Sequence, residues 1–501
     1  MRAPTLLRVL LEKRGWAGWS AFGIHFARAA RRAAKELGNH RLASVTVSST
    51  TFKRWLNGEQ IPRGDARMVL EYMLGVNADQ LFQPAPSREV VTARTPHRTS
   101  LAAALALDSA WLSSSLSPDS PAPGVDGVWR LGGLRFFDGT SVAVQMYEAR
   151  AQDDVVLIGP EDHPHMKSFV QPSRRALLLA SLGAAGGEGL YVLDAAYARR
   201  HLAVDQPVGT LPVPAPYRLD DLTYGILWAV TNLDDSLLAD DHTLDSEERE
   251  LAPYLAQSRS AVARSAAPEL SAVGAAWLGS RFCMLYVCKR LRDLQDDSEP
   301  LRFWCREQWG EEASTLLFFR HRHSALSRVK DRHSGPDAPP GAAFCLPEAN
   351  VKESERYERV LLFLALALLE LRGVTVWVCT EPEYAQLDAF TLTPDGRVIV
   401  ANWLRGDGIW HVDTADRRPE AHTYAQAVHH ARATSVVAGP TPAVRLRALA
   451  DYLGLDWAWL TARCRELAHY GTLGMLRPRS RLISLDELDA TLRFVGGFAA
   501  A

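Results

Sequence analysis

The most informative segment of this 501-residue chain is Val47-Ser-Ser-Thr-Thr-Phe-Lys-Arg-Trp-Leu-Asn-Gly58. Its two serines are residue types that cap helix N-termini, and its final glycine is typical of a helix end. The segment therefore predicts a helix over residues 50–57. Phe52 and Trp55 lie three residues apart on one side of that helix, where they can enter a core.

The flanking segments also predict helices. Upstream of the helix over residues 50–57, Ser20 can cap a helix that runs to Leu37. Downstream of it, Pro62 sets a turn. A helix over residues 65–74 and a short helical turn over residues 77–82 follow. The apolar side chains of the first helix recur on one face: Phe22, Phe26, Ala29, Ala33 and Leu37.

This arrangement resembles the helix-turn-helix of XRE-type (lambda repressor/Cro-like) transcriptional regulators. The matching residues are the segment 47–58, Ile61-Pro62, Leu74-Gly-Val76 and Asp79-Gln-Leu-Phe82, within about residues 20–82. The resemblance implies a helix in the major groove of double-stranded DNA, and a homodimer on inverted half-sites about one helical turn apart. Only seven of the 56 Lys and Arg residues are lysine, which is typical of GC-rich, actinomycete-like bacteria.

The start of the recognition helix supplies the candidate DNA-binding residues. Hydroxyl groups can bond to base edges, a lysine can reach a guanine or a phosphate, and arginines suit phosphate contacts. The candidates are Ser48, Ser49, Thr50, Thr51, Lys53, Arg54, Asn57 and Arg63. We assign Phe52 and Trp55 to the core of the module instead.

The charge distribution agrees with a polyanion-binding N-terminal end. The formal net charge of the chain is -2. Residues 1–83 hold 13 Lys and Arg against 6 Asp and Glu, a net of +7, and the remainder holds 43 against 52, a net of -9. A basic module on an acidic body indicates that one end meets a polyanion, although a solvated basic face is the alternative.

The composition is that of an ordinary globular protein, with 47% hydrophobic and 23% charged residues. No apolar run reaches the ~18 residues of a membrane span, and charges interrupt the apolar N-terminal residues, so we expect neither a membrane partner nor a signal peptide. The six cysteines form no Cys-x-x-Cys pair and are expected to be free thiols. These features predict a cytoplasmic, nucleoid-associated protein.

The expected fold is mainly α with a mixed α+β body, divided by Pro-rich linkers. The expected parts are residues 1–83 (helix-turn-helix DNA-binding domain), 84–127 (linker, with a helix over 101–112), 128–333 (α+β then helical body domain), 334–350 (linker), 351–440 (α+β subdomain) and 441–501 (winged-helix-like module).

Residue patterns predict the elements of the body. Strands are expected over residues 134–137, 141–147, 154–158, 374–379, 389–393 and 398–403, and helices over 354–371 and most of 219–329. The first two strands are expected to form a hairpin through the turn Asp138-Gly139, and the last two a hairpin through the turn Pro394-Asp395-Gly396. The aromatic-rich helices over 222–238, 272–294 and 301–323 are expected to fill a core. Alternatively they line a pocket for an apolar small-molecule effector.

Residues 443–485 resemble a winged helix more weakly, through Leu449-Ala-x-x-Leu-Gly454 and Leu467-x-x-x-Gly471. The wing would carry Arg477, Arg479 and Arg481 as a second DNA contact. Winged helices also serve as dimerisation and protein-contact modules, and both interpretations stay open.

The sequence contains no convincing catalytic set, and we expect no catalytic residue, metal site or cofactor. Residues 153–165 include Asp153, Asp154, Glu161, Asp162, His163 and His165, which could supply metal ligands or acid–base groups. Pro160 and Pro164 favour a solvated loop there. His321 and His323 point to different faces of a helix. Residues 183–189 are glycine-rich but lack the Gly-Lys-Ser/Thr of a phosphate loop.

The predicted function is a sequence-specific DNA-binding transcriptional regulator and not an enzyme. The N-terminal module would read the major groove, and the C-terminal body would dimerise and could sense an effector. Two alternatives remain: an interaction protein whose helix-turn-helix binds a protein partner, and an enzyme that uses the Asp154/His163 region with an appended DNA-targeting module.

Overall fold

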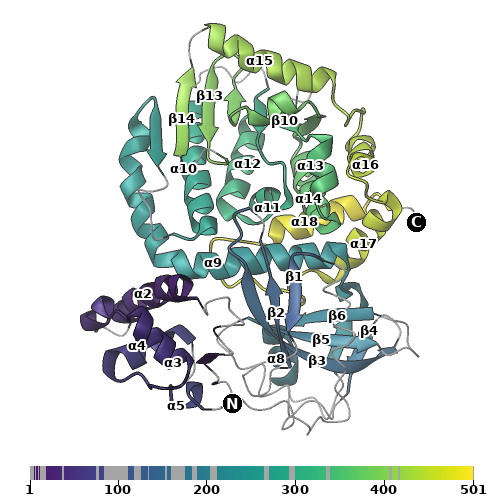
Figure 1. Ribbon diagram of the computed structural model, residues 1–501. Helices are drawn as coiled ribbons and strands as arrows, with labels where there is room; N and C mark the ends of the chain where they lie inside the picture. The colour runs from purple at the N-terminus through teal and green to yellow at the C-terminus, as the bar shows by residue number, and fades with distance from the viewer. Residues whose placement is uncertain are drawn as a thin grey trace. The chain divides into compact units, whose positions relative to one another are not determined.

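The computed structural model divides the chain into two compact units, Met1–Pro96 and His97–Ala501 (Figure 1). The structure describes residues 5, 7–8, 11, 18–36, 39–74, 78–83, 111–117, 126–133, 135–152, 155–159, 175–182, 189–203, 211–263, 270–292, 300–333, 339–405, 409–415 and 418–499. The predicted helix over 101–112 falls outside these residues except at its last two positions. The described residues are of mixed α+β class, 54% helical and 21% strand.

The first unit is helical. Its elements are α2 (Trp19–Glu36), η1 (His40–Ser44), α3 (Ser49–Leu56), α4 (Gly64–Leu74) and α5 (Ala78–Leu81). The side chains that face one another inside it include Leu7, Leu11, Phe22, Phe26, Ala30, Ala33, Leu42, Phe52, Trp55, Val69, Leu70, Leu74 and Leu81. The predicted apolar residues Phe22, Phe26, Ala29 and Ala33 of α2 are therefore buried, and α2 packs against α3 and α4, as amphipathic helices do in small domains. The last predicted residue of this face, Leu37, lies outside the described residues.

The second unit contains a first sheet of seven strands in its described part. These are β1 (Ser114–Ser117), β2 (Gly127–Leu131), β3 (Thr140–Gln152), β4 (Val155–Ile158), β5 (Ala176–Leu182), β6 (Gly189–Asp194) and β7 (Leu211–Pro214). The order is β1-β2-β3-β4-β7, and β5 pairs with β3 and β6. All pairings are antiparallel except β3 with β5.

The hairpin predicted before β3 was wrong in its first strand. Residues 135–137 form no strand, and β2 at residues 127–131 is the partner of β3 instead. The cause is Glu311, whose Oε2 accepts hydrogen bonds from the backbone N–H groups of Arg135, Phe136 and Phe137 at 3.0, 2.7 and 3.0 Å. A carboxylate thus occupies the donors that a neighbouring strand would need.

The second sheet also has seven strands among the described residues. These are β8 (Ser260–Ala263), β9 (Arg302–Cys305), β10 (Gly341–Cys345), β11 (Thr375–Cys379), β12 (Phe390–Leu392), β13 (Val398–Asn402) and β14 (Ile409–Ala415). The order is β11-β10-β9-β12-β13-β14-β8. Strands β9, β10 and β11 are parallel, and the other pairings are antiparallel. The predicted hairpin of β12 and β13 is confirmed.

Two predictions for this region were wrong. Residues 341–345, placed in a linker, form β10, which is fully buried between β9 and β11. Residues 302–305, placed in a helix, form β9. Parallel strands that are buried on both faces have short apolar sequences without alternation, so they lack the pattern that identifies a strand. The prolines around β10 favoured a linker instead.

Helices pack on both sheets of the second unit. They are α8 (Ala195–Ala203), α9 (Asp221–Leu251), α10 (Ala272–Arg292), α11 (Gly310–Phe318), α12 (Arg320–His333), α13 (Glu348–Glu353), α14 (Arg356–Leu371), α15 (Arg418–Ala433), α16 (Pro442–Tyr452), α17 (Trp457–Tyr470) and α18 (Asp486–Gly496). Helix α15 packs on one face of the second sheet, and α10 and α14 pack on the opposite face. Helix α9 runs between the two sheets (Figure 1). It contacts β2 and β3 of the first sheet on one side and helices α10, α11 and α14 on the other.

The wing implied by the winged-helix resemblance is not formed. Residues 471–485, which join α17 to α18, contain turns and one isolated bridge between Ile483 and Phe319, but no β-hairpin. Their backbone is held by Asp234 of α9, whose carboxylate accepts from the N–H groups of Arg479 (2.9 Å) and Ser480 (2.6 Å). The segment therefore packs along α9 instead of pairing with itself.

In the part of the chain that the structure describes, no helix combines the length and apolar character needed to cross a bilayer. None of the six cysteines, all of which are described, forms a disulfide.

Candidate nucleic-acid interface

Helix α3 begins and ends where the serine caps and the glycine predicted. Ser48 has extended backbone dihedrals, and its Oγ accepts from the N–H of Thr51 at 3.1 Å. The Thr51 hydroxyl lies 2.9 Å from the same oxygen. Gly58, at φ 69°, turns the chain after Asn57. Two candidate residues, Ser48 and Thr51, thus stabilise the helix N-terminus.

The two large apolar residues of α3 anchor it in the first unit. Phe52 stacks on Phe22 of α2 with ring centroids 4.2 Å apart, and Trp55 lies 6.2 Å from Phe26. Both α3 side chains are buried. Their assignment to the core is confirmed.

The opposite face of α3 is exposed and polar. Ser49 and Lys53 lie four residues apart, and Thr50, Arg54 and Asn57 follow the same helical spacing, and all five are exposed. Helix α3 contains no acidic residue. The structure therefore gathers these candidates on one face, which can meet a surface as a unit.

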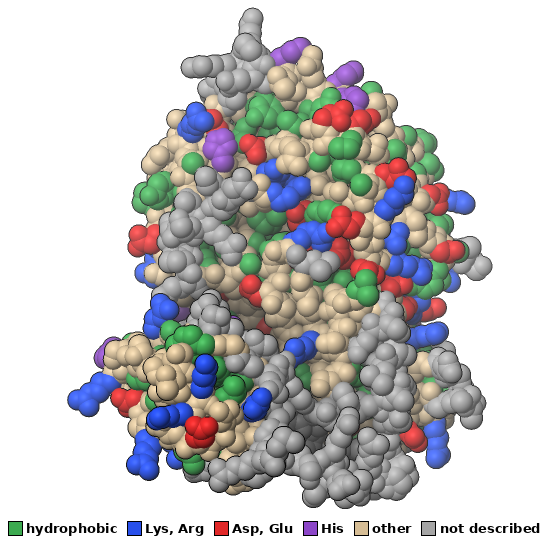
Figure 2. All heavy atoms as spheres, viewed as in Figure 1, with side chains coloured by type: hydrophobic (Ala, Val, Ile, Leu, Met, Phe, Trp, Pro, Cys, Tyr) green, Lys and Arg blue, Asp and Glu red, His purple; other side chains and the backbone are tan. Residues whose placement is uncertain are grey.

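The cations of this face are available. Among the described residues, Lys53, Arg54 and Arg63 form no ion pair, and all three are exposed. Asn57 donates from Nδ2 to Oε1 of Glu59 at 3.2 Å, so its amide is partly engaged. Figure 2 shows Lys and Arg side chains exposed on the first unit.

The element before α3 is short. Residues His40–Ser44 form a single 3₁₀ segment, capped by Asn39. Residues 45–48 then connect it to α3 without regular structure. Leu42 is buried, and this side chain fixes the segment against the core.

The predicted second DNA contact lies in an acidic environment. Arg479 pairs with Asp234 (Nε to Oδ2, 3.2 Å) and with Asp235, and Arg481 pairs with Asp241 (3.2 Å) and Asp245 (2.7 Å). The Arg477 backbone N–H donates to Asp194 at 3.4 Å. A phosphate would have to compete with these carboxylates of the same unit, so we do not extend the proposed interface to these arginines.

The remaining sequence candidates that the structure describes do not come together as a metal site. His321 and His323 are buried and bonded separately, to Ser280 Oγ (2.9 Å) and to the Leu316 carbonyl (3.0 Å). Burial lowers the pKa of both imidazoles. The described residues include no group of three or more His, Cys, Asp or Glu side chains suited to a metal ion. Most of the glycine-rich stretch lies outside the described residues, as do the six acidic and histidine candidates Asp153, Asp154, Glu161, Asp162, His163 and His165.

Sequence reasoning missed a buried charged cluster that follows β9. Glu312 pairs with Arg405 at 3.2 Å, and Glu358 lies 3.5 Å from Arg135, whose guanidinium stacks over Trp309. Burial raises the pKa of both Glu312 and Glu358 to about 7. The run of charged residues after a buried strand could have indicated this cluster, but the strand itself was not recognised.

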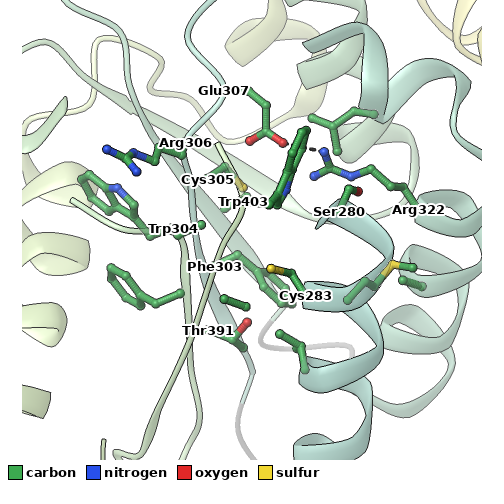
Figure 3. Close-up of a pocket in the computed structure, with 18 of the residues that line it drawn as sticks. Ser280, Cys283, Phe303, Trp304, Cys305, Arg306, Glu307, Arg322, Thr391 and Trp403 are labelled. Carbon is green, nitrogen blue, oxygen red and sulfur yellow. Dashed lines mark ion pairs between the residues drawn. The ribbon is translucent and has the colours of Figure 1, made fainter. Parts of the chain in front are cut away.

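A cavity also lies beside β9, between the second sheet and helices α10 and α12 (Figure 3). Phe303 and Cys305 of β9 face it, whereas Trp304 and Arg306 point to the other side of the strand. The aromatic residues predicted for the helices are mostly core: Trp228, Tyr286 and Phe282 are buried.

Comparison with known proteins adds no family to this description: no family model, curated protein or solved structure matches the chain.

Proposed function

We propose that the protein is a sequence-specific DNA-binding transcriptional regulator in which residues 1–83 form a helix-turn-helix and α3 is the recognition helix. The observation that carries the proposal is the exposed face of α3. It places two hydroxyl residues, an amide and two unpaired cations on one side of a helix whose other side is locked into a core.

The chemistry of this face suits a duplex. Ser49 and Thr50 stand in the first turn of α3, where a recognition helix meets base edges. Lys53 follows one turn later and can reach a guanine or a phosphate. Arg54 and Arg63 are placed to contact phosphates and so to fix the register of the protein on DNA.

We further propose that the protein acts as a homodimer at the nucleoid, on inverted half-sites spaced by about one helical turn, as the family resemblance implies. The second unit would supply the dimer contacts.

Quantitative binding of the full chain to its own upstream region, with unrelated DNA as competitor at two salt concentrations, tests the proposal. A specific to non-specific ratio of about 10³ or more is expected. Equal affinity for both DNAs with a steep salt dependence would refute sequence-specific recognition. Absence of any DNA binding would favour a protein partner for the same face.

Two variants test the role of α3. Lys53→Ala and Arg54→Ala should each weaken specific binding, by about 5- to 150-fold for a base contact and with a salt slope reduced by about 1 for a phosphate contact. Lys352→Ala is the control, because Lys352 is an exposed cation of the second unit. Unchanged affinity for both α3 variants would overturn the assignment of the recognition helix.

A further inference from the structure

The cavity beside β9 has the dimensions of a binding site for a small molecule. Its volume is about 180 Å³. Apolar protein cavities of roughly 150 Å³ hold a benzene molecule and exclude water. The space is thus sufficient for one aromatic ring with a small substituent or fused ring.

The wall of the cavity is almost entirely apolar. Helix α10 contributes Met284, Val287 and Leu291, α12 contributes Leu326, and β9 contributes the ring of Phe303. Cys283 and Cys305 also line it, and burial raises the pKa of both thiols, so they are neutral. Burying an apolar ligand against such a wall is favourable because apolar surface is removed from water, whereas these side chains offer no partner to an ionised group.

One hydroxyl on the wall is available. Thr391 of β12 is 4% exposed, and its side chain forms no hydrogen bond within the described part of the chain. The other lining hydroxyl, Ser280, is already bonded to His321. A buried hydroxyl without a partner favours a ligand that brings a donor or an acceptor to it.

The charged groups at the end of the cavity neutralise each other. Arg322 of α12 pairs with Glu307 at 2.6 Å and donates to the Thr315 hydroxyl at 2.8 Å. Figure 3 shows this pair beside Trp403, whose ring lies 5.7 Å from the Arg322 guanidinium. Arg306 points away and donates to the Leu404 carbonyl at 2.7 Å. An ionised ligand would therefore lose its hydration without gaining an unpaired opposite charge.

We propose that this cavity binds an uncharged, mainly apolar molecule of the size of a substituted or bicyclic aromatic ring, oriented by a hydrogen bond to the Thr391 hydroxyl. The site lies wholly within the second unit, and the proposal does not depend on DNA binding by α3.

Indole and indole-3-carboxylate are suitable probes, because they share a ring system and differ in charge at neutral pH. Calorimetric titration of the full chain, without DNA, should show one indole bound with a Kd below about 1 mM and at least tenfold weaker binding of the carboxylate. Failure of indole to bind up to its solubility limit would overturn the proposal. Equal binding of the anion would overturn the assignment to uncharged ligands.

Variants locate the site. Ala325→Trp places a large side chain on the cavity wall of α12 and should weaken indole binding at least tenfold. Ser324→Trp is its control, because Ser324 is the adjacent residue of the same helix and is exposed. Equal affinities of the two variants would place the bound indole elsewhere.

Thr391→Val tests the hydrogen bond. It removes the hydroxyl with little change of shape and should weaken indole about two- to tenfold while leaving the binding of benzene unchanged. An equal effect on both ligands would assign the loss to packing and refute the orienting role of Thr391. Melting temperatures and circular dichroism of each variant show whether the fold is retained.

Discussion

Replacement of Asp234 by alanine should release residues 471–485 from α9. The Asp234 side chain is fully buried and accepts four hydrogen bonds, from the backbone of Arg479 and Ser480, from Arg175 Nη2 (2.7 Å) and from Arg479 Nε (3.2 Å). Arg175 would keep only Asp194 (3.3 Å) as an ionic partner. The substitution thus removes one member of a buried charge network and leaves two backbone donors without an acceptor.

The expected cost follows from these contacts. Breaking a buried ion pair by removing one partner costs about 3–5 kcal/mol, and this range already includes part of the cost of the unpaired donors. If the free energy of local opening of residues 471–485 falls by about 4 kcal/mol, the population in which this segment is detached from α9 rises roughly 10³-fold. Asp234→Asn keeps one acceptor oxygen and should give a smaller loss.

Hydrogen exchange measured on peptides that cover residues 471–485 reports this opening directly. Asp245→Asn is the control, because Asp245 pairs with Arg481 at the surface, where the pair contributes about 0–1 kcal/mol. If Asp234→Ala changed the exchange of this peptide no more than Asp245→Asn did, the anchoring role of Asp234 would be refuted.

Three further predictions concern stability. The pKa of Glu358 is raised to about 7, chiefly by burial and against the attraction of Arg135, so the folded state keeps a proton that the unfolded state releases. The stability due to this group is present below pH ~4.5 and is lost as the pH rises through about 7. Urea titrations at pH 5 and pH 8 should show a larger loss in the native chain than in Glu358→Gln, which keeps the contribution of Glu312, whose pKa is also raised to about 7. Phe52→Ala should destabilise the first unit by about 3–5 kcal/mol and abolish DNA binding, while hydrogen exchange of residues 471–485 stays unchanged, whereas a change there would contradict the division into units. Gly341→Ala should lower the urea midpoint by overpacking worth about 1–3 kcal/mol, since an added Cβ would lie 2.1 Å from the Trp377 ring; Gly18→Ala, with no atom within 4 Å, is the control, and equal midpoints would contradict the packing argument.

The elements that depend on local signals could be predicted from the sequence. Helix α3 lies at residues 49–56, within one residue of the prediction, because its cap and its terminating glycine are neighbours in the chain. Helix α14 and the hairpin of β12 and β13 follow for the same reason: their periodicity or turn is contained in a few residues.

The elements that depend on partners distant in the sequence could not be predicted from it. Strands β9 and β10 are four or five residues long and are defined by their neighbours in the sheet. The arginines near residue 480 look like a surface patch in sequence, but their carboxylate partners lie more than 230 positions earlier, on α9. The cavity and the carboxylate of Glu311 that holds residues 135–137 arise in the same way from the assembled fold.

The anchoring of residues 471–485 on α9 has a consequence for biosynthesis. Ribosomes add about 5–20 residues per second, so the stretch from the end of α9 at Leu251 to Gly471 takes roughly 10–45 s to make. During that interval Asp234 has Arg175 as a native partner but lacks the donors of Arg479 and Ser480, and the apolar sites later covered by Met475, Leu476 and Ile483 are uncovered. The first unit has left the ribosome by then and has its own core. A nascent chain would therefore present a folded N-terminal module on an incomplete body, and chaperones would be needed at the body rather than at the module.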